Sequence, residues 1–159
     1  MTRRRVIGID PGLSSTGYAV LDFAENRYTL LTHGVIETQA HAVHGERLLK
    51  IYDALCAILR EFSPEEAGIE TLFFSRNVTS ALAVSEARGV VTMCLTQAGI
   101  KIGEYSPNII KQAVSGNANA DKKTVQEYTR MILGLREVPK PDHAADAIAA
   151  AITQINSSR

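Results

Sequence analysis

Apolar stretches and turn residues divide the first forty residues into three short extended segments. The run RVIGID at 5–10 is apolar and ends at an acid, and PGLSST at 11–16 has the proline, glycine and serines of a turn. Two further apolar runs follow at 17–23 and 27–38, with a tight reversal between them. Strands joined this closely predict an antiparallel meander.

Helices and short strands alternate along the rest of the chain. Residues 46–61 have helical apolar spacing, and residues 77–98 are rich in alanine and helix-like. Short strands are predicted at 65–70 and 101–105, followed by three more helices. These begin at Ser106-Pro107, at Asp121 and near Pro141. The order predicts an α/β fold, with a five-stranded mixed sheet flanked by helices, in a single domain over 1–159.

Composition excludes little but constrains how phosphate could be bound. Basic and acidic residues cancel at 17 each, so any phosphate binding must come from a local patch or from bound metal ions. We expect a cytoplasmic protein with no membrane partner, because no segment looks long enough to cross a bilayer. The two cysteines, Cys56 and Cys94, are interpreted as small buried hydrophobes in a reducing compartment.

Two of the predicted strands end on an acid, Asp10 in the first and Glu70 in the fourth. Acids at the carboxyl ends of neighbouring strands would lie side by side, at the edge where α/β sheets bind ligands. Two bare carboxylates repel each other, but a divalent cation between them removes that cost. Taken alone, each acid fits an ordinary turn or strand-end charge equally well.

The last predicted helix opens with three ionisable residues, Asp142, His143 and Asp146. At about 100° per residue, His143 lies roughly 60° and Asp142 roughly 40° from Asp146, so either could share a site with it. Asp142 has another explanation, since an acid in the first turn interacts favourably with the helix dipole. Carboxylate and imidazole ligands of this kind suit Mg²⁺ or Mn²⁺ and favour phosphoryl transfer or phosphodiester hydrolysis by two metals.

Five segments, taken in order, resemble the RuvC family of bacterial Holliday junction resolvases: GIDPG…TGYAV, IETLFFSRN, ARG, IKQAVSGNANADK and DHAADAIAAAIT. The resemblance implies an RNase H-like fold and a homodimer that nicks four-way DNA junctions symmetrically, in homologous recombination and DNA repair. It also implies two Mg²⁺ or Mn²⁺ ions per active site. The implied catalytic and metal-ligating residues are Asp10, Glu70, His143 and Asp146. Many relatives have Asp-x-x-Asp where this chain has His-x-x-Asp.

The same resemblance implies residues that contact DNA. They are Phe73, Phe74, Arg76, Asn77, Lys111 and Lys122. One of the two phenylalanines would stack on an unpaired base at the junction, and the other could be core. The lysines would neutralise phosphates. The helix at 77–98 resembles the family's dimer-forming helix, and RuvA and RuvB are the implied branch-migration partners.

In the resulting hypothesis a metal-activated water attacks the scissile phosphorus in line, and His143 also acts in proton transfer. Two alternative classes remain open. An ATP-binding module of the actin or sugar-kinase type also has an Asp-x-Gly turn after its first strand, but needs a second domain to close over nucleotide. A catalytically inactive junction-binding protein would tolerate replacement of the acids.

Overall fold

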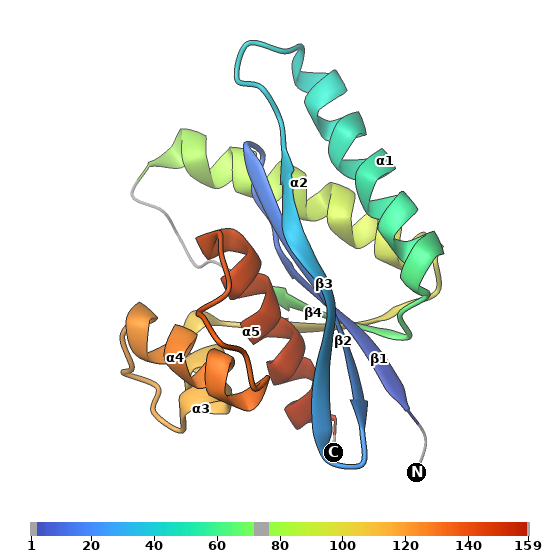
Figure 1. The fold of residues 1–159 in the computed structure, drawn as a ribbon. Helices are drawn as coiled ribbons and strands as arrows, with labels where there is room; N and C mark the ends of the chain where they lie inside the picture. Colours follow the sequence, from blue (N-terminus) through green and yellow to red (C-terminus); the bar gives the residue numbers. More distant parts are fainter. Residues whose placement is uncertain (1–2, 72–76, 159) are drawn as a thin grey trace.

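Five strands form one mixed sheet in the computed structural model, which describes residues 3–71 and 77–158 (Figure 1). Their order across the sheet is β3-β2-β1-β4-β5. The predicted meander is confirmed, because β1 pairs antiparallel with β2, and β2 with β3. β4 and β5 are parallel to β1, so the sheet is mixed. The strands are β1 (Arg4–Asp10), β2 (Ser15–Ala24), β3 (Arg27–Glu37), β4 (Glu66–Glu70) and β5 (Lys101–Tyr105).

Helices cover both faces of this sheet (Figure 1). One face carries α1 (His44–Phe62) and α2 (Val78–Gln97). The other carries α5 (Asp142–Ser157), with α3 (Pro107–Ser115) and α4 (Lys122–Ile132) packed beside it. All five helices begin and end within a few residues of the predicted positions.

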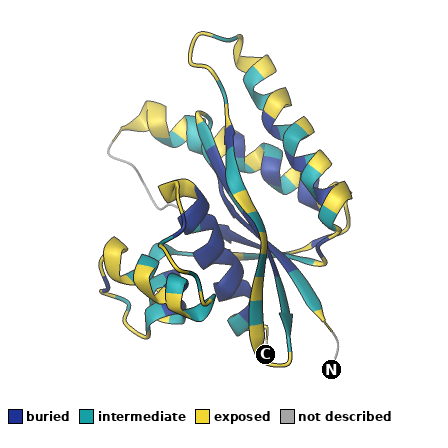
Figure 2. Ribbon diagram, viewed as in Figure 1, coloured by how far each residue is buried: buried dark blue, intermediate teal, exposed yellow. Residues whose placement is uncertain are grey.

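The central strand β1 serves both halves of the core. Ile7 and Ile9 point into the cluster beneath α1 and α2, while Val6 belongs to the cluster beneath α5. Side chains alternate between the faces of a strand, so a strand buried on both faces reads as a continuous apolar run. Figure 2 shows this buried strand and the buried body of α5 between the more exposed outer helices.

The helix α5 lies unusually close to the sheet. A Cβ atom added at Gly8 would stand 1.8 Å from the carbonyl oxygen of Ala147, and one at Gly68 would stand 2.4 Å from that of Ala150. Gly8 and Gly68 are register partners on β1 and β4. Small residues on both sides therefore let the backbones meet, and nearly every α5 residue from Ala144 onward is buried.

The two helices that carry lysines of interest begin at caps that the sequence predicts. Ser106 accepts a hydrogen bond from the backbone N–H of Ile109 at the start of α3. Asp121 accepts one from Thr124 at 2.7 Å, which places Lys122 at the first position of α4. A capped first turn holds its side chains at a defined height relative to α5.

The expectation that no segment is long enough to cross a bilayer is wrong for the long helix α2. Within the described residues it is long and apolar enough to cross a membrane by length and composition, with a mean hydropathy of 1.3. It packs against the sheet through Ala87, Val91 and Leu95, and one such helix is weak evidence for a membrane. Three large apolar side chains of this helix, Val78, Leu82 and Met93, are exposed, which is a feature of protein interfaces as well.

Candidate metal centre

The first acid pair arises directly from sheet topology. β1 and β4 are parallel neighbours with Ile9 opposite Ile69, so the following residues, Asp10 and Glu70, emerge at the same edge of the sheet. Asp10 is 8% exposed and therefore largely removed from water. The expectation that these two strand ends meet is confirmed.

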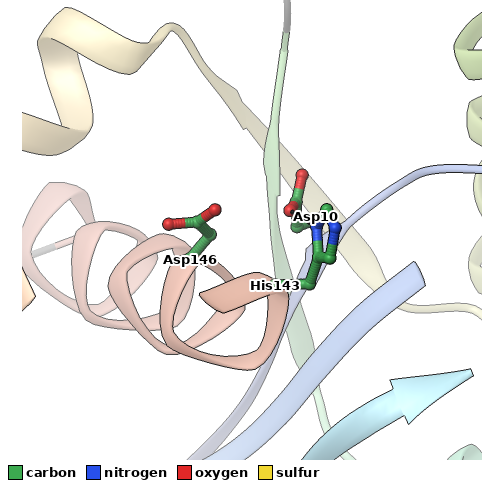
Figure 3. A group of neighbouring side chains, drawn as sticks. All are labelled: Asp10, His143 and Asp146. Atoms are coloured by element: carbon green, nitrogen blue, oxygen red, sulfur yellow. Dashed lines mark hydrogen bonds and ion pairs between the residues drawn. The ribbon is translucent and has the colours of Figure 1, made fainter. Parts of the chain in front are cut away.

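Three of the four predicted ligands form a compact cluster. Ligand atoms of Asp10, His143 and Asp146 all lie within 4.8 Å of one another (Figure 3). His143 Nδ1 is 3.0 Å from Asp10 Oδ2, and Asp146 projects from the next turn of α5. Two carboxylates and one imidazole form a donor set that fits a divalent cation such as Mn²⁺ or Mg²⁺.

A glycine on β2 sets the distance between Asp10 and His143. Gly17 is the register partner of Asp10. A Cβ atom at Gly17 would lie 2.0 Å from the carbonyl oxygen of His143, so only glycine lets the first turn of α5 reach this position. Gly17 is not among the site residues predicted from the sequence, although it lies in the TGYAV segment that carries the resemblance.

Glu70 faces the cluster from a greater distance. Among the described residues it is not part of the three-residue group, but it lines a cavity of about 170 Å³ with Lys111, Lys122 and Asp146. Burial, followed by repulsion from Asp10 and Asp146, raises the pKa of Glu70 to about 7. The carboxylate is thus held where negative charge is already in excess, and a cation nearby would relieve that repulsion.

Asp10 shows the same tension. Burial raises the pKa of Asp10, Asp146 adds to the increase, and the hydrogen bond with His143 opposes it. Acids that are buried together without enough positive charge are costly in a protein that binds nothing there. A cation-binding site explains why the fold tolerates them.

The structure separates the two candidate partners of Asp146. His143 lies in the cluster, whereas the side chain of Asp142 is 68% exposed and faces α4. There Asp142 accepts a hydrogen bond from Gln126 Nε2 at 3.2 Å and lies 3.5 Å from Lys122 Nζ. The hydrogen bond from Gln126 and the charge of Lys122 lower the pKa of Asp142. Its surroundings are therefore those of a surface acid paired with α4.

Both predicted lysines stand beside the acids. Lys122 Nζ is 3.3 Å from Asp146 Oδ2, and Lys111 lines the same cavity as Glu70. Burial disfavours the charged form of Lys122, yet Asp146 and Asp142 outweigh it and raise the pKa of the lysine. Positive charge is thereby kept next to the candidate metal centre.

Of the remaining predicted DNA contacts, Asn77 alone lies within the described residues. Phe73, Phe74 and Arg76 lie outside the described residues. Asn77 is exposed and caps α2, where its side chain accepts a hydrogen bond from the backbone N–H of Thr79 at 3.0 Å. This structural duty accounts for an asparagine here and leaves its role toward DNA a prediction.

Fold and site together define an α/β protein of mixed sheet with a candidate divalent-metal centre at its strand ends. The family model described as "Crossover junction endodeoxyribonuclease RuvC" matches residues 6–154. The chain belongs to the RuvC family.

Named relatives and solved structures agree with this assignment. A crossover junction endodeoxyribonuclease RuvC from Treponema denticola is 57% identical over 95% of this chain and 85% of the relative. One from Chloroflexus aurantiacus is 46% identical over 93% of this chain and 90% of the relative. The structure of Thermus thermophilus RuvC in complex with a Holliday junction substrate superimposes with a TM-score of 0.94, at 35% identity, over 98% of this chain and 95% of that one. The RNase H-like fold expected from the resemblance is confirmed.

Proposed function

We propose that this chain is a metal-dependent endonuclease that resolves Holliday junctions by paired nicks, in homologous recombination and DNA repair. The observation that carries the proposal is the cluster of Asp10, His143 and Asp146 at the sheet edge, in a member of the RuvC family. An inert junction-binding module would have no need to bury Asp10 beside other acids.

In this proposal Asp10, His143 and Asp146 hold the metal, and Glu70 completes the site from the neighbouring strand. Two Mg²⁺ or Mn²⁺ ions, when bound, would supply Lewis-acid activation of water and stabilise the leaving oxygen. His143 already contacts Asp10 through Nδ1, so its imidazole is fixed in orientation for ligation or proton transfer. Lys111 and Lys122 would neutralise the phosphate that enters this edge.

The proposed substrate is a four-way DNA junction, held by two kinds of contact. Lys111 and Lys122 border the acids and are suited to the backbone phosphates. Phe73 or Phe74 would stack on an unpaired base, and Arg76 and Asn77 would also contact the DNA. Base stacking on an aromatic ring contributes about 1–3 kcal/mol and does not depend on the base.

We also propose a homodimer that uses α2, as a single RNase H-like nuclease domain over 1–159. Val78, Leu82 and Met93 are large apolar side chains exposed on this helix. A cavity of about 920 Å³ is lined by Met93 together with small and polar residues, including Ser85 and Gly89 of the same helix. Two copies related by a two-fold axis would present two sites to a two-fold junction. A cytoplasmic location and cooperation with RuvA and RuvB belong to the same proposal.

The test is cleavage of a synthetic four-way junction with Mg²⁺ or Mn²⁺. We expect paired nicks from the wild type and no cutting by Asp10→Asn or Asp146→Asn, with junction binding retained in both. Asp53→Asn removes an exposed acid of α1 and should cut normally. Absence of cutting by the wild type with either metal would overturn the enzyme assignment and favour the inactive junction binder. Mg²⁺-dependent ATP binding would instead revive the kinase-like alternative.

A further inference from the structure

The two cysteines of the chain meet between α1 and α2. Cys56 and Cys94 are the only cysteines in the sequence, 38 positions apart, and both are free. Their sulfur atoms lie 2.9 Å apart, and a disulfide bond is about 2.04 Å long. The sulfurs therefore need to approach by less than about one ångström to bond.

Their exposure differs in a way that favours stepwise oxidation. Cys94 is 1% exposed, and burial raises the pKa of its thiol to about 12. Cys56 is partly exposed, and a cavity of about 250 Å³ beside the pair, bordered by Tyr52, Arg60 and Gln97, opens to solvent. Both cysteines line this cavity, so an oxidant that entered it would meet the more exposed Cys56, with the Cys94 sulfur 2.9 Å away as a resolving thiol.

We propose that Cys56 and Cys94 are a reversible redox pair, which a peroxide or a low-molecular-weight disulfide converts into an intrachain disulfide. The inference concerns the opposite face of the sheet from α5 and does not depend on the nuclease activity.

With hydrogen peroxide the chemistry balances in two steps. The Cys56 thiolate attacks one peroxide oxygen, the O–O bond breaks, and the departing hydroxide takes up the thiol proton as water. The sulfur of Cys94 then attacks the resulting sulfenic acid, so that the S–S bond forms, the S–O bond breaks, and a second water leaves. The two sulfurs give two electrons to the peroxide. With a small disulfide, exchange through a mixed disulfide gives the same product and two small thiols, and an added dithiol reverses either route.

The bond would join the two helices that cover one face of the sheet. Cys94 belongs to the core cluster beneath α1 and α2, and Cys56 packs against that cluster. The closed loop of 38 positions includes β4. Because a crosslink restricts the unfolded chain more than the folded one, the thermal midpoint should rise by roughly 10 °C on oxidation.

The experiment exposes the full-length protein to hydrogen peroxide in one arm and oxidised glutathione in another. Intact mass after alkylation under denaturing conditions, and mapping of protease-generated peptides, report the product. We expect a monomer chain two hydrogens lighter, with the peptides of Cys56 and Cys94 linked, no thiol left to alkylate, and full reversal by a dithiol. The thermal midpoint should rise with crosslinking and fall again on reduction.

Two variants supply matched controls. Cys56→Ser and Cys94→Ala should each remain uncrosslinked within the chain and show no rise in thermal midpoint with oxidant. Three results on the wild type would overturn the proposal: both thiols still alkylated after oxidation, a sulfinic acid at Cys56 without a crosslink, or disulfides only between chains. Because these outcomes are read from the wild type, they hold even if a variant folds poorly.

Discussion

His143 and Asp142 are sequence neighbours, but their side chains point to different partners. We predict that His143→Ala lowers metal-dependent junction cleavage by at least about 100-fold, because it removes an imidazole in contact with Asp10. Asp142→Ala should change the rate by less than about threefold, because it removes an exposed acid paired with α4. Cleavage rates at saturating Mn²⁺ measure both. Equal losses, or a greater loss in Asp142→Ala, would contradict the assignment.

Glu70 should make the stability of the metal-free protein depend on pH. The pKa of Glu70 in the folded protein is about 7, above the ordinary value of 4.5. Its contribution to the free energy of unfolding is therefore fully present below about pH 4.5 and is lost as the pH rises through about 7. Because glutamine does not ionise, Glu70→Gln removes this pH-dependent loss of stability. The variant should therefore gain on the wild type with rising pH, by on the order of 2–3 kcal/mol above pH 7.

Denaturant unfolding with a chelator, at intervals between about pH 5 and pH 8, measures the effect. Glu61→Gln, an exposed position on α1, serves as the control and should show no such trend. Adding Mn²⁺ at high pH should reverse the order, because the ion stabilises the wild-type carboxylate and leaves the amide unsupported. If the difference in free energy of unfolding between Glu70→Gln and the wild type were constant across the pH range, the pKa of Glu70 would not be raised in the folded protein.

Lys122 pairs with Asp146 and is also predicted to contact a DNA phosphate, and a salt titration separates these two roles. We predict that Lys122→Gln weakens junction binding and reduces the slope of log affinity against log salt by about 1, as loss of one phosphate contact requires. Lys50→Gln, on the exposed side of α1, should leave both unchanged. Fluorescence anisotropy with a labelled junction in Ca²⁺ gives the slope without cutting. An unchanged slope for Lys122→Gln would assign this lysine to its acid partners alone.

At the scale of the element, the first turn of α5 depends on a bare backbone in β2. Gly17→Ala should destabilise the protein by about 1–3 kcal/mol, because its methyl group would meet the His143 carbonyl. It should also weaken Mn²⁺ binding, since His143 and Asp146 must move from Asp10 together. Gly45→Ala, which has nothing within 4 Å in α1, is the matched control and should be neutral or stabilising.

Thermal unfolding and calorimetric titration with Mn²⁺ distinguish the two effects. If Gly17→Ala loses stability but keeps its Mn²⁺ affinity, the close approach of β2 and α5 at Gly17 supports packing but does not determine the geometry of the metal site.

The sequence predicts the elements well because their signals are local. Each element carries its own signals, such as an apolar run, a cap or, for α3, the proline at 107. The acids that end β1 and β4, Asp10 and Glu70, can likewise be read directly from the sequence. Topology then brings those two acids together, since β1 and β4 are parallel. Angles around a helix cannot choose between Asp142 and His143, because the choice depends on where α5 meets the sheet.

That meeting point is fixed by contacts that are distant in sequence. Gly17 touches His143, and Cys56 touches Cys94, through packing that no local periodicity encodes. The interpretation of the cysteines as buried hydrophobes fits Cys94 but does not include their mutual contact. Composition and spacing do not decide between Asp142 and His143. The choice of His143 comes from the match of the DHAADAIAAAIT segment to the RuvC family.

At the scale of the whole molecule, α2 is the surface that we propose as the dimer interface, because it exposes Val78, Leu82 and Met93. Replacing Leu82 or Met93 with glutamate should convert the proposed dimer into a monomer, because a charge would be buried at its centre. Leu49→Glu alters a comparably exposed apolar residue of α1 and should leave the dimer intact. Light scattering after gel filtration gives the mass. Monomeric variants should nick one strand without the paired second cut, and a persistent dimer would place the interface elsewhere.

The contact between Asp10 and His143 joins residues 133 positions apart. During synthesis, β1 leaves the ribosome long before α5 exists, and a nascent chain carries Asp10 and Glu70 without their helical partners. Translation thus delivers His143 and Asp146 well after Asp10 and Glu70, so a product that terminates before α5 lacks two residues of the candidate centre. Because the candidate centre is completed only when α5 packs on the sheet, unfinished chains of this kind would carry no assembled metal site.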